Sequence, residues 1–151
     1  MKKTTFAIFL TLLMTGCASV KMESQEASNR AKQFSSPSSG YSGLYIYRDG
    51  NLGAALKKNI WVDGKCIGES APGVFFFTEV AGNKEHTIAT QSEFSPNKLT
   101  QFFNSGKNYF IRQYIKLGVF IGGADLEVVP EDQAKTEISK LALATPGTCS
   151  E

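Results

Sequence analysis

The chain has 151 residues, of which 42% are hydrophobic and 20% charged, so it has enough apolar material for one modest core and is not disordered throughout. Its formal charge is +2, and without Lys2 and Lys3 the remaining 14 basic residues match the 14 acidic ones. A near-neutral chain lacks the basic surface that nucleic-acid binding requires, so we expect no nucleic-acid partner.

The N-terminal stretch, MKKTTFAIFLTLLMTGC, is typical of an export signal. Lys2 and Lys3 give it a positive start, and the apolar run 6–14 is too short for a bilayer span, which needs about 20 residues. The stretch ends in the letters LMTGC, which closely resemble the lipobox of bacterial lipoproteins. The one departure is Met14, because leucine is usual at that position.

The lipobox resemblance implies a signal peptide over residues 1–16, with cleavage between Gly16 and Cys17. It also implies lipidation of Cys17, with a diacylglyceryl group on the sulfur and a third acyl chain on the new amino group. The residues after Cys17 include no early aspartate, which resembles outer-membrane sorting. The alternative is an ordinary secretory signal with an incidental cysteine. We therefore expect a protein held by its lipid in the outer membrane of a bacterial cell envelope, with its domain in the periplasm or at the cell surface.

Residues 17–40 predict a flexible tether that follows the lipidated cysteine. Serine dominates this stretch, Pro37 interrupts it, and its apolar residues follow neither a helical nor a strand period. A random coil of this length has a mean reach of about 25 Å. The alternative is a short amphipathic helix around residues 23–34.

Residues 41–145 are expected to form a β-rich domain. The fourteen glycines and eleven phenylalanines of the chain favour strands joined by turns. The clearest element is a hairpin in which 60–62 and 65–67 flank Asp63-Gly64, a dipeptide that accepts positive φ at both turn positions. Together with six further β-forming runs, it predicts an antiparallel β-sandwich or small barrel of about seven strands. Those runs are GLYIYRDG, GVFFFTEV with HTIATQS, LTQFF, NYFIRQYIK and ADLEVV.

One α-helix is expected near the end of the domain, before a tail at 146–151. Residues 130–144 begin with a proline and two acids and carry Lys140 late, as helices do. The strand that contains Val74–Phe77 is apolar on both faces and needs cover on both sides. We expect the helix to pack on or beside the sheet through Ala134, Ile138, Leu141 and Ala142.

The stretch IWVDGKCIGESAPGVFFFTEVAGNKEHTIAT resembles the repeat core of the PEGA family, with its Asp-Gly turn, Pro-Gly step and returning strand. With NYFIRQYI and PEDQAKTEISKL, the chain is similar over residues 41–143 to a family of small bacterial lipoproteins of unknown function (DUF2846-like). The resemblance implies a PEGA-like β-sandwich and no recorded catalytic residues. Ala81-Gly82 stands where Pro-Gly is common in that pattern.

The cysteines offer one further covalent link. If Cys17 carries lipid, Cys66 and Cys149 remain as a pair in an oxidising compartment and predict a disulfide worth about 4 kcal/mol in the chain-entropy model. The alternative is that Cys66 is a small buried residue and Cys149 a free thiol.

No residues in the sequence predict catalysis or a bound metal or cofactor. His86 is the one histidine, and Cys66 lies inside a predicted strand where nothing lowers its pKa, so this pair is a poor nucleophile and base. One histidine and two distant cysteines do not make a zinc site, and the glycines of 118–123 lack a phosphate-binding spacing. Five aromatic residues either fill the core or line a surface that grips sugar or peptide: Tyr45, Tyr47, Trp61, Tyr109 and Tyr114.

These features favour a non-enzymatic accessory or binding module that is attached to the membrane by its lipid. Its partner would be a protein or an envelope polymer, met through loops or an exposed strand edge. The first alternative is an envelope inhibitor or immunity-type lipoprotein that blocks an enzyme with a loop, and the second is a periplasmic hydrolase.

Overall fold

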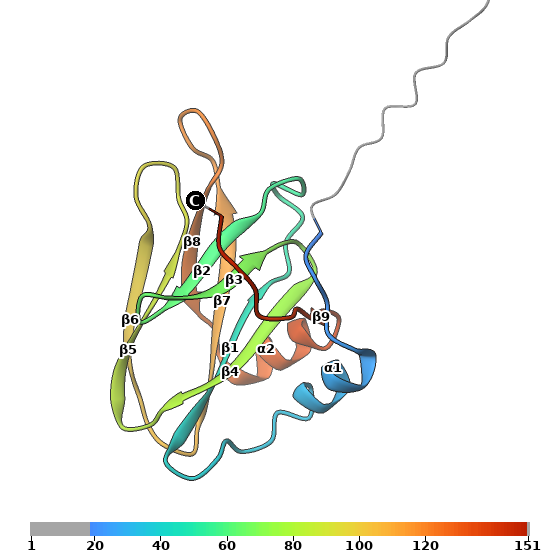
Figure 1. Ribbon diagram of the computed structural model, residues 1–151, viewed down its shortest axis with the longest axis vertical. Coiled ribbons are helices and arrows are strands. Elements are labelled where there is room, and N and C mark those ends of the chain that lie inside the picture. Colours follow the sequence, from blue (N-terminus) through green and yellow to red (C-terminus); the bar gives the residue numbers. More distant parts are fainter. Residues whose placement is uncertain (1–18, 151) are drawn as a thin grey trace, which may run out of the picture.

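Residues 19–150 are described by a computed structural model, in which they form nine strands and two helices (Figure 1). The helices are α1 (Gln25–Ala31) and α2 (Glu131–Ile138). The strands are β1 (Tyr41–Arg48), β2 (Lys58–Val62), β3 (Lys65–Ser70), β4 (Val74–Ala81), β5 (Lys84–Thr90), β6 (Asn97–Phe103), β7 (Asn108–Lys116), β8 (Gly123–Val128) and β9 (Ala142–Leu143).

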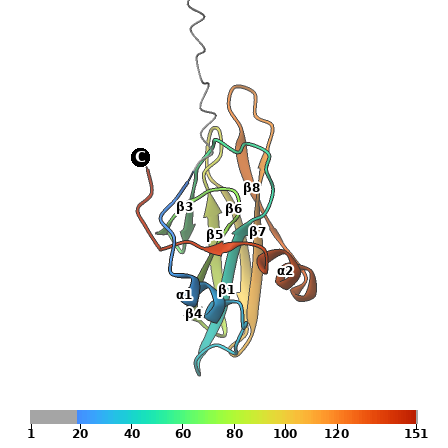
Figure 2. The same ribbon diagram turned by 90° about the vertical axis from the view of Figure 1, so that its right-hand side faces the viewer.

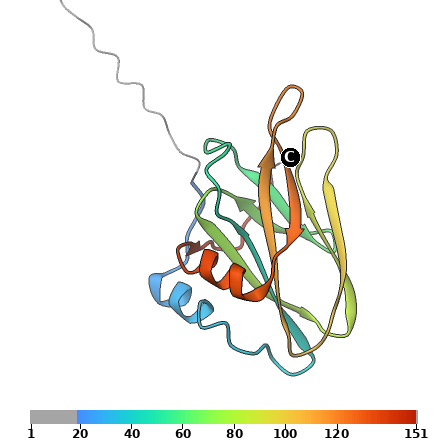
Figure 3. The ribbon, with the colours of Figure 1, turned by 180° about the vertical axis from the view of Figure 1, so that it is seen from behind.

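The strands form two sheets that pack face to face within this part of the chain. One, called here the β1 sheet, has the order β8-β7-β1-β4-β9, and the other, the β2 sheet, has the order β3-β2-β5-β6. Both helices lie at the outer face of the β1 sheet, as the side view and the view from behind show (Figures 2 and 3). The prediction of a mainly β sandwich with a C-terminal helix is confirmed.

The pairing of the strands is mixed rather than antiparallel throughout. β1 pairs with β4 antiparallel but with β7 parallel, from Gly43 opposite Asn108 to Tyr47 opposite Arg112. β4 and β9 are also parallel. A parallel pair needs a long connection, and the whole β2 sheet lies between β1 and β7 in the sequence. Turn signals reveal neighbours joined by short loops, so they could not reveal this pair.

The predicted hairpin at Asp63-Gly64 is confirmed. The two turn residues have φ values of 51° and 77°, and β2 and β3 pair antiparallel on either side of them. The register shifts because Ile60 pairs with Gly68 but Trp61 pairs with Cys66, which leaves Ile67 as the extra residue of a bulge in β3. Gly68 has a φ of 148°, a backbone conformation that favours glycine.

The apolar run in β4 is covered on both faces, as its sequence requires. Phe76 lies in the core between the sheets, with Ile46, Ile88 and other buried residues of both layers. Phe75 points to the other side, into a second core with Ile138 of α2. The prediction that the C-terminal helix packs on the sheet is therefore confirmed.

Helix α2 is shorter than the predicted range of 130–144. It ends at Ile138, and Ala142, expected on the apolar face of the helix, lies in β9 instead. Ala142 donates its backbone N–H to the Gly73 carbonyl oxygen at 3.1 Å, and Ala144 donates to that of Phe75 at 2.8 Å. The helix ends early because the free edge of β4 provides hydrogen-bond partners for the backbone of these residues, which they could not use if the helix continued.

The expected tether is the main correction to the fold. Within 17–40, the residues from Ser19 onward that the structure describes lie against the domain, and α1 occupies the centre of the alternative helix range 23–34. The Ser24 hydroxyl caps α1 by accepting from the Ala27 N–H at 3.1 Å. Phe34 packs on Tyr45 with ring centroids 5.3 Å apart. The residues that this segment packs against are distant in sequence, so its own low apolar content does not indicate whether it is ordered. Gly16 and Cys17 lie outside the described residues.

Candidate functional site

The two ends of the described chain run side by side across the edge of the β1 sheet. The backbone N–H of Glu23 donates to Leu143 and that of Thr145 donates to Lys21, both at 2.9 Å. Met22 and Ala144 form an isolated antiparallel bridge between these contacts. The segment that follows Cys17 in the sequence is therefore fixed to the domain by the C-terminal segment.

The C-terminal tail continues along the β2 sheet and is fixed there by a disulfide. Cys66 on β3 and Cys149 are bonded, with an S–S distance of 2.05 Å and a Cα–Cα distance of 6.0 Å. Asn59 of β2 holds the next residue through both its amide groups: Nδ2 donates to the Ser150 carbonyl at 2.7 Å, and Oδ1 accepts from the Ser150 N–H at 3.1 Å. The tail expected at 146–151 is thus held against the domain as far as Ser150, the last described residue.

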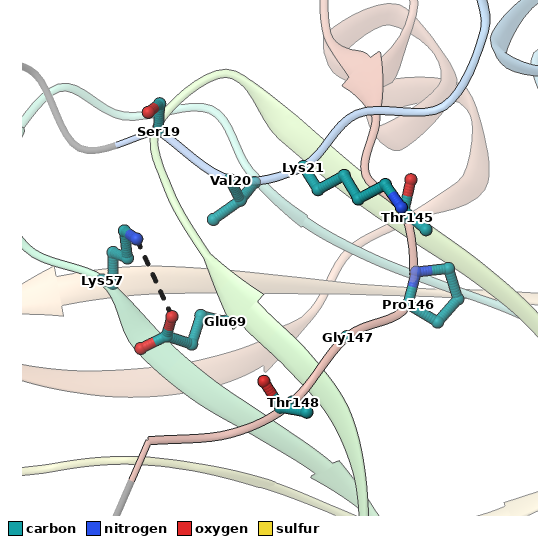
Figure 4. A pocket seen from close by; sticks show the side chains of 9 residues that line it. All are labelled: Ser19, Val20, Lys21, Lys57, Glu69, Thr145, Pro146, Gly147 and Thr148. Atoms are coloured by element: carbon teal, nitrogen blue, oxygen red, sulfur yellow. Dashed lines mark ion pairs between the residues drawn. The ribbon is translucent and has the colours of Figure 1, made fainter.

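An open cleft of about 650 Å³ lies where the two chain ends cross the sheets (Figure 4). Its lining comes from the N-terminal segment, from Lys57 just before β2, from β3 and from the C-terminal tail. The lining residues are Ser19, Val20, Lys21, Lys57, Glu69, Thr145, Pro146, Gly147 and Thr148. This is the candidate binding site that lies nearest in sequence to Cys17.

The cleft brings charged side chains and hydroxyls together. Lys57 Nζ lies 3.8 Å from Glu69 Oε2, and Figure 4 shows this ion pair opposite the side chain of Lys21. Two ammonium groups with nearby hydroxyls can hold a polar or anionic group. Its lining residues include no cysteine or histidine.

His86 is a structural residue of the β2 sheet. Its ring is buried, Nε2–H donates to the Ala81 carbonyl at 2.7 Å, and Nδ1 lies 2.6 Å from Asp63 Oδ2. Desolvation acts to raise the pKa of Asp63, but the Thr87 N–H and His86 outweigh it and leave that pKa below its ordinary value. Both ring nitrogens are engaged and Cys66 is in the disulfide, so these two residues do not form a catalytic pair.

A second charged cluster joins α2 to the outer face of the β1 sheet. Arg112 of β7 donates from Nε to Glu127 at 2.7 Å and from Nη1 to Glu137 at 3.3 Å, and Asp49 lies 3.8 Å away. The Tyr47 hydroxyl donates to the other oxygen of Glu137 at 2.5 Å. The single guanidinium of Arg112 faces all three carboxylates and so links β7, β8, α2 and the residue after β1 in one structural network.

The pKa shifts in this cluster also indicate a structural role. Burial, and then the hydrogen bond to Glu137, raise the pKa of Tyr47 far above its ordinary value. Burial also acts to raise the pKa of Glu137, but hydrogen bonds from Tyr47 and Gln133 and the charge of Arg112 hold it below its ordinary value. Tyr47 stays protonated and Glu137 stays ionised at neutral pH, so neither is poised for proton transfer.

The aromatic residues that could have lined a sugar or peptide surface do not gather on one. Tyr45 and Tyr47 are both 1% exposed and belong to the core beneath α2, while Tyr109 stacks on Phe103 at 4.1 Å. Tyr114 is 38% exposed, but most of the other exposed large apolar residues lie in loops at one end of the sandwich. Four of them, Leu117, Val119, Phe120 and Ile121, belong to the glycine-spaced run LGVFIGG.

The described residues form neither a membrane-spanning helix nor a cluster of metal ligands. Between Ser19 and Ser150, no helix is both long enough and apolar enough to cross a membrane. In that same part of the chain, His, Cys, Asp and Glu side chains nowhere gather in groups of three that could hold a metal ion.

Comparison with known proteins gives a family and a relative. Residues 38–124 match the family described as "Protein of unknown function (DUF2846)". The chain is also 57% identical to an uncharacterized protein of Haemophilus influenzae over 137 residues, which is 91% of this chain and 81% of the relative. No solved structure matches the chain.

Proposed function

The chain belongs to the DUF2846 family of proteins of unknown function, and from that premise we propose that it is a lipid-anchored lipoprotein of the bacterial cell envelope. It is made with a signal peptide over residues 1–16 and carries its lipid on Cys17. The sorting residues after Cys17 favour the outer membrane. Its PEGA-like domain acts without catalysis, as an accessory or binding module.

The sequence around Cys17 is the observation that carries this proposal. A positive start, a short apolar run and a Gly-Cys junction coincide at the spacing of a lipobox. Several acyl chains on one residue make a stable membrane anchor, whereas a single chain binds only marginally.

The non-enzymatic part of the proposal rests on the polar sites of the domain. His86 has both ring nitrogens bonded, and the carboxylates around Arg112 are paired within the fold. In the cleft beside the chain ends, the carboxylate Glu69 is paired with Lys57, and the lining includes no histidine or cysteine. These features support a module that binds, with an envelope protein or polymer as its partner.

Metabolic labelling with an alkyne analogue of palmitate tests the anchor. We expect the wild-type protein to be labelled and to sediment with membranes, and Cys17→Ser to lose both properties. The matched control is the double variant Cys66→Ser/Cys149→Ser, which should keep the label because those sulfurs form the disulfide. Unchanged labelling of Cys17→Ser would refute the proposed anchor.

One observation favours a second candidate, the envelope inhibitor that blocks an enzyme with a loop. The β7–β8 loop (117–122) protrudes from one end of the sandwich and exposes large apolar side chains (Figure 1). Chemical crosslinking in intact envelopes distinguishes the two candidates. A protein adduct that disappears in Phe120→Ser favours the inhibitor, whereas an adduct unaffected by that change favours an accessory module that binds through another surface.

A further inference from the structure

Three loops at one end of the sandwich expose large apolar side chains to solvent. They are the β1–β2 loop (49–57), the β5–β6 loop (91–96) and the β7–β8 loop (117–122), all at the top of Figure 1. Six residues of these loops are called here the apolar tip: Leu52 (57% exposed), Phe94 (78%), Leu117 (87%), Val119 (76%), Phe120 (82%) and Ile121 (57%). Single exposed apolar residues are ordinary on soluble proteins, but a group of this size at one end marks an interaction surface.

The β7–β8 loop is held in shape by one carboxylate from the neighbouring loop. Glu93 accepts backbone N–H bonds from Val119 at 2.7 Å, Phe120 at 2.5 Å and Ile121 at 3.1 Å. Three consecutive donors are thus satisfied within the protein, while the apolar side chains of the same residues point outward. A loop entering lipid needs this arrangement, because an unpaired N–H is costly there.

The β1–β2 loop is held by a buried arginine. Arg48, at the end of β1, is 1% exposed and donates from Nη1 to the Leu56 carbonyl at 2.7 Å and from Nη2 to the Gly53 carbonyl at 2.7 Å. A further contact, at 3.1 Å, goes to the carbonyl of Leu52 itself. Two of the three loops of the apolar tip are therefore fixed by a charged side chain that forms hydrogen bonds with the backbone of the loop.

The described chain begins in the same half of the molecule as the apolar tip. Ser19, the first described residue, comes two positions after Cys17, and two residues span at most about 7 Å. Ser19 lines the same cleft as Lys57, which ends the β1–β2 loop. All three views place the start of the described chain in the half of the molecule that carries the apolar tip (Figures 1, 2 and 3).

We propose that the apolar tip inserts into the lipid surface to which Cys17 is attached, so that the sandwich stands end-on at the membrane. This inference rests on the proposed lipidation of Cys17. The N-terminal segment is hydrogen-bonded to the domain from Lys21 onward, which leaves too little free chain to lift the domain clear of the headgroups. A surface held this close to lipid, with apolar side chains at its end, meets lipid before any other partner. Amphipathic surfaces of this kind bury apolar side chains about 5–10 Å into the headgroup region.

Fluorescence quenching in vesicles tests the insertion with the full, processed protein. The one native tryptophan is first replaced by Trp61→Phe, and a new reporter is then introduced as Phe120→Trp. The matched control is Phe102→Trp, because Phe102 is 50% exposed and lies at the other end of β6 from the β5–β6 loop. Each protein is reconstituted into phosphatidylethanolamine and phosphatidylglycerol vesicles, with and without brominated acyl chains.

We expect brominated lipid to remove roughly half or more of the Phe120→Trp emission, with a blue shift on reconstitution, and to leave Phe102→Trp unchanged. A lipidated protein that floats with the vesicles but shows no quenching of Phe120→Trp overturns the insertion and leaves the tip for a protein partner. Equal quenching at both positions overturns the end-on orientation. The intact mass of the protein in each sample is also measured by mass spectrometry. A protein that lacks the added mass of the lipid overturns the proposed anchor and the insertion together.

Discussion

Thr145 donates its backbone N–H to the carbonyl oxygen of Lys21 at 2.9 Å, joining two residues that lie near opposite ends of the sequence. Because Lys21 follows Cys17 by four positions, this bond decides how far a lipid on Cys17 is from the folded domain. Instead of a tether with a reach of about 25 Å, the domain has only a few residues between itself and the proposed anchor.

The N-terminal segment should therefore contribute to stability. Phe34 packs between Tyr45 and Phe110, with ring centroids 5.3 and 6.0 Å away. We expect Phe34→Ala to lower the free energy of unfolding by about 2 kcal/mol, less than a fully buried phenylalanine because its ring is partly exposed. Urea denaturation measures the change, and Gln33→Ala is the exposed control. Equal stability of the two variants would mean that this segment is a tether after all.

Helix α2 should be an essential part of the second core. Ile138 is fully buried against the β1 sheet, so Ile138→Asp places a carboxylate in an apolar environment without a partner. We expect a loss of at least about 3 kcal/mol of unfolding free energy and a marked fall in melting temperature. Thr136→Asp, on the exposed face of the same helix, should have little effect. Similar melting temperatures for the two variants would show that α2 does not pack on the sheet in solution.

The disulfide should stabilise the domain by limiting the unfolded chain. It closes a loop with a sequence separation of 83 residues, and cross-links of this kind contribute about 2–4 kcal/mol. Cys66→Ser/Cys149→Ser should lower the unfolding free energy by that amount, and reductant should do the same to the wild type. Reductant should not affect the double variant. If it destabilises the double variant equally, the effect does not come from this bond.

The Glu137 network predicts a loss of stability in acid. In the folded state the pKa of Glu137 is held below its ordinary value of 4.5. The ionised carboxylate therefore contributes its full stabilisation above about pH 4.5, and this contribution is lost as the pH falls through the lowered pKa. The stability difference between wild type and Glu137→Gln should therefore shrink as the pH is lowered from about 5 to 3. Glu85→Gln, at an exposed position of β5, is the control. A difference that is constant over this range contradicts the network.

Local signals in the sequence were enough to predict most strands and the C-terminal helix. The Asp63-Gly64 turn works because its residues accept positive φ whatever surrounds them, and the doubly apolar Val74–Phe77 required cover from both sides. The parallel pairing of β1 with β7 could not be predicted in this way, since its register depends on contacts between residues far apart in the chain.

The candidate sites also divide into those that local sequence could predict and those that depend on contacts between distant residues. Cys66 and Cys149 could be paired by counting, whereas the cleft and the apolar tip arise where loops distant in sequence meet. The order of residues 19–40 was missed because Phe34 and Ala31 find their apolar partners on β1 and β7, not within their own segment. A serine-rich composition indicates flexibility only when the rest of the protein offers no such surface.

The most direct test of this account is the mass of the N-terminal peptide of the mature protein, extracted from membranes with detergent. We predict a peptide that begins at Cys17 and carries a diacylglyceryl group and one further acyl chain. A mature protein that begins at another residue, or a Cys17 peptide with no added lipid mass, would contradict the account.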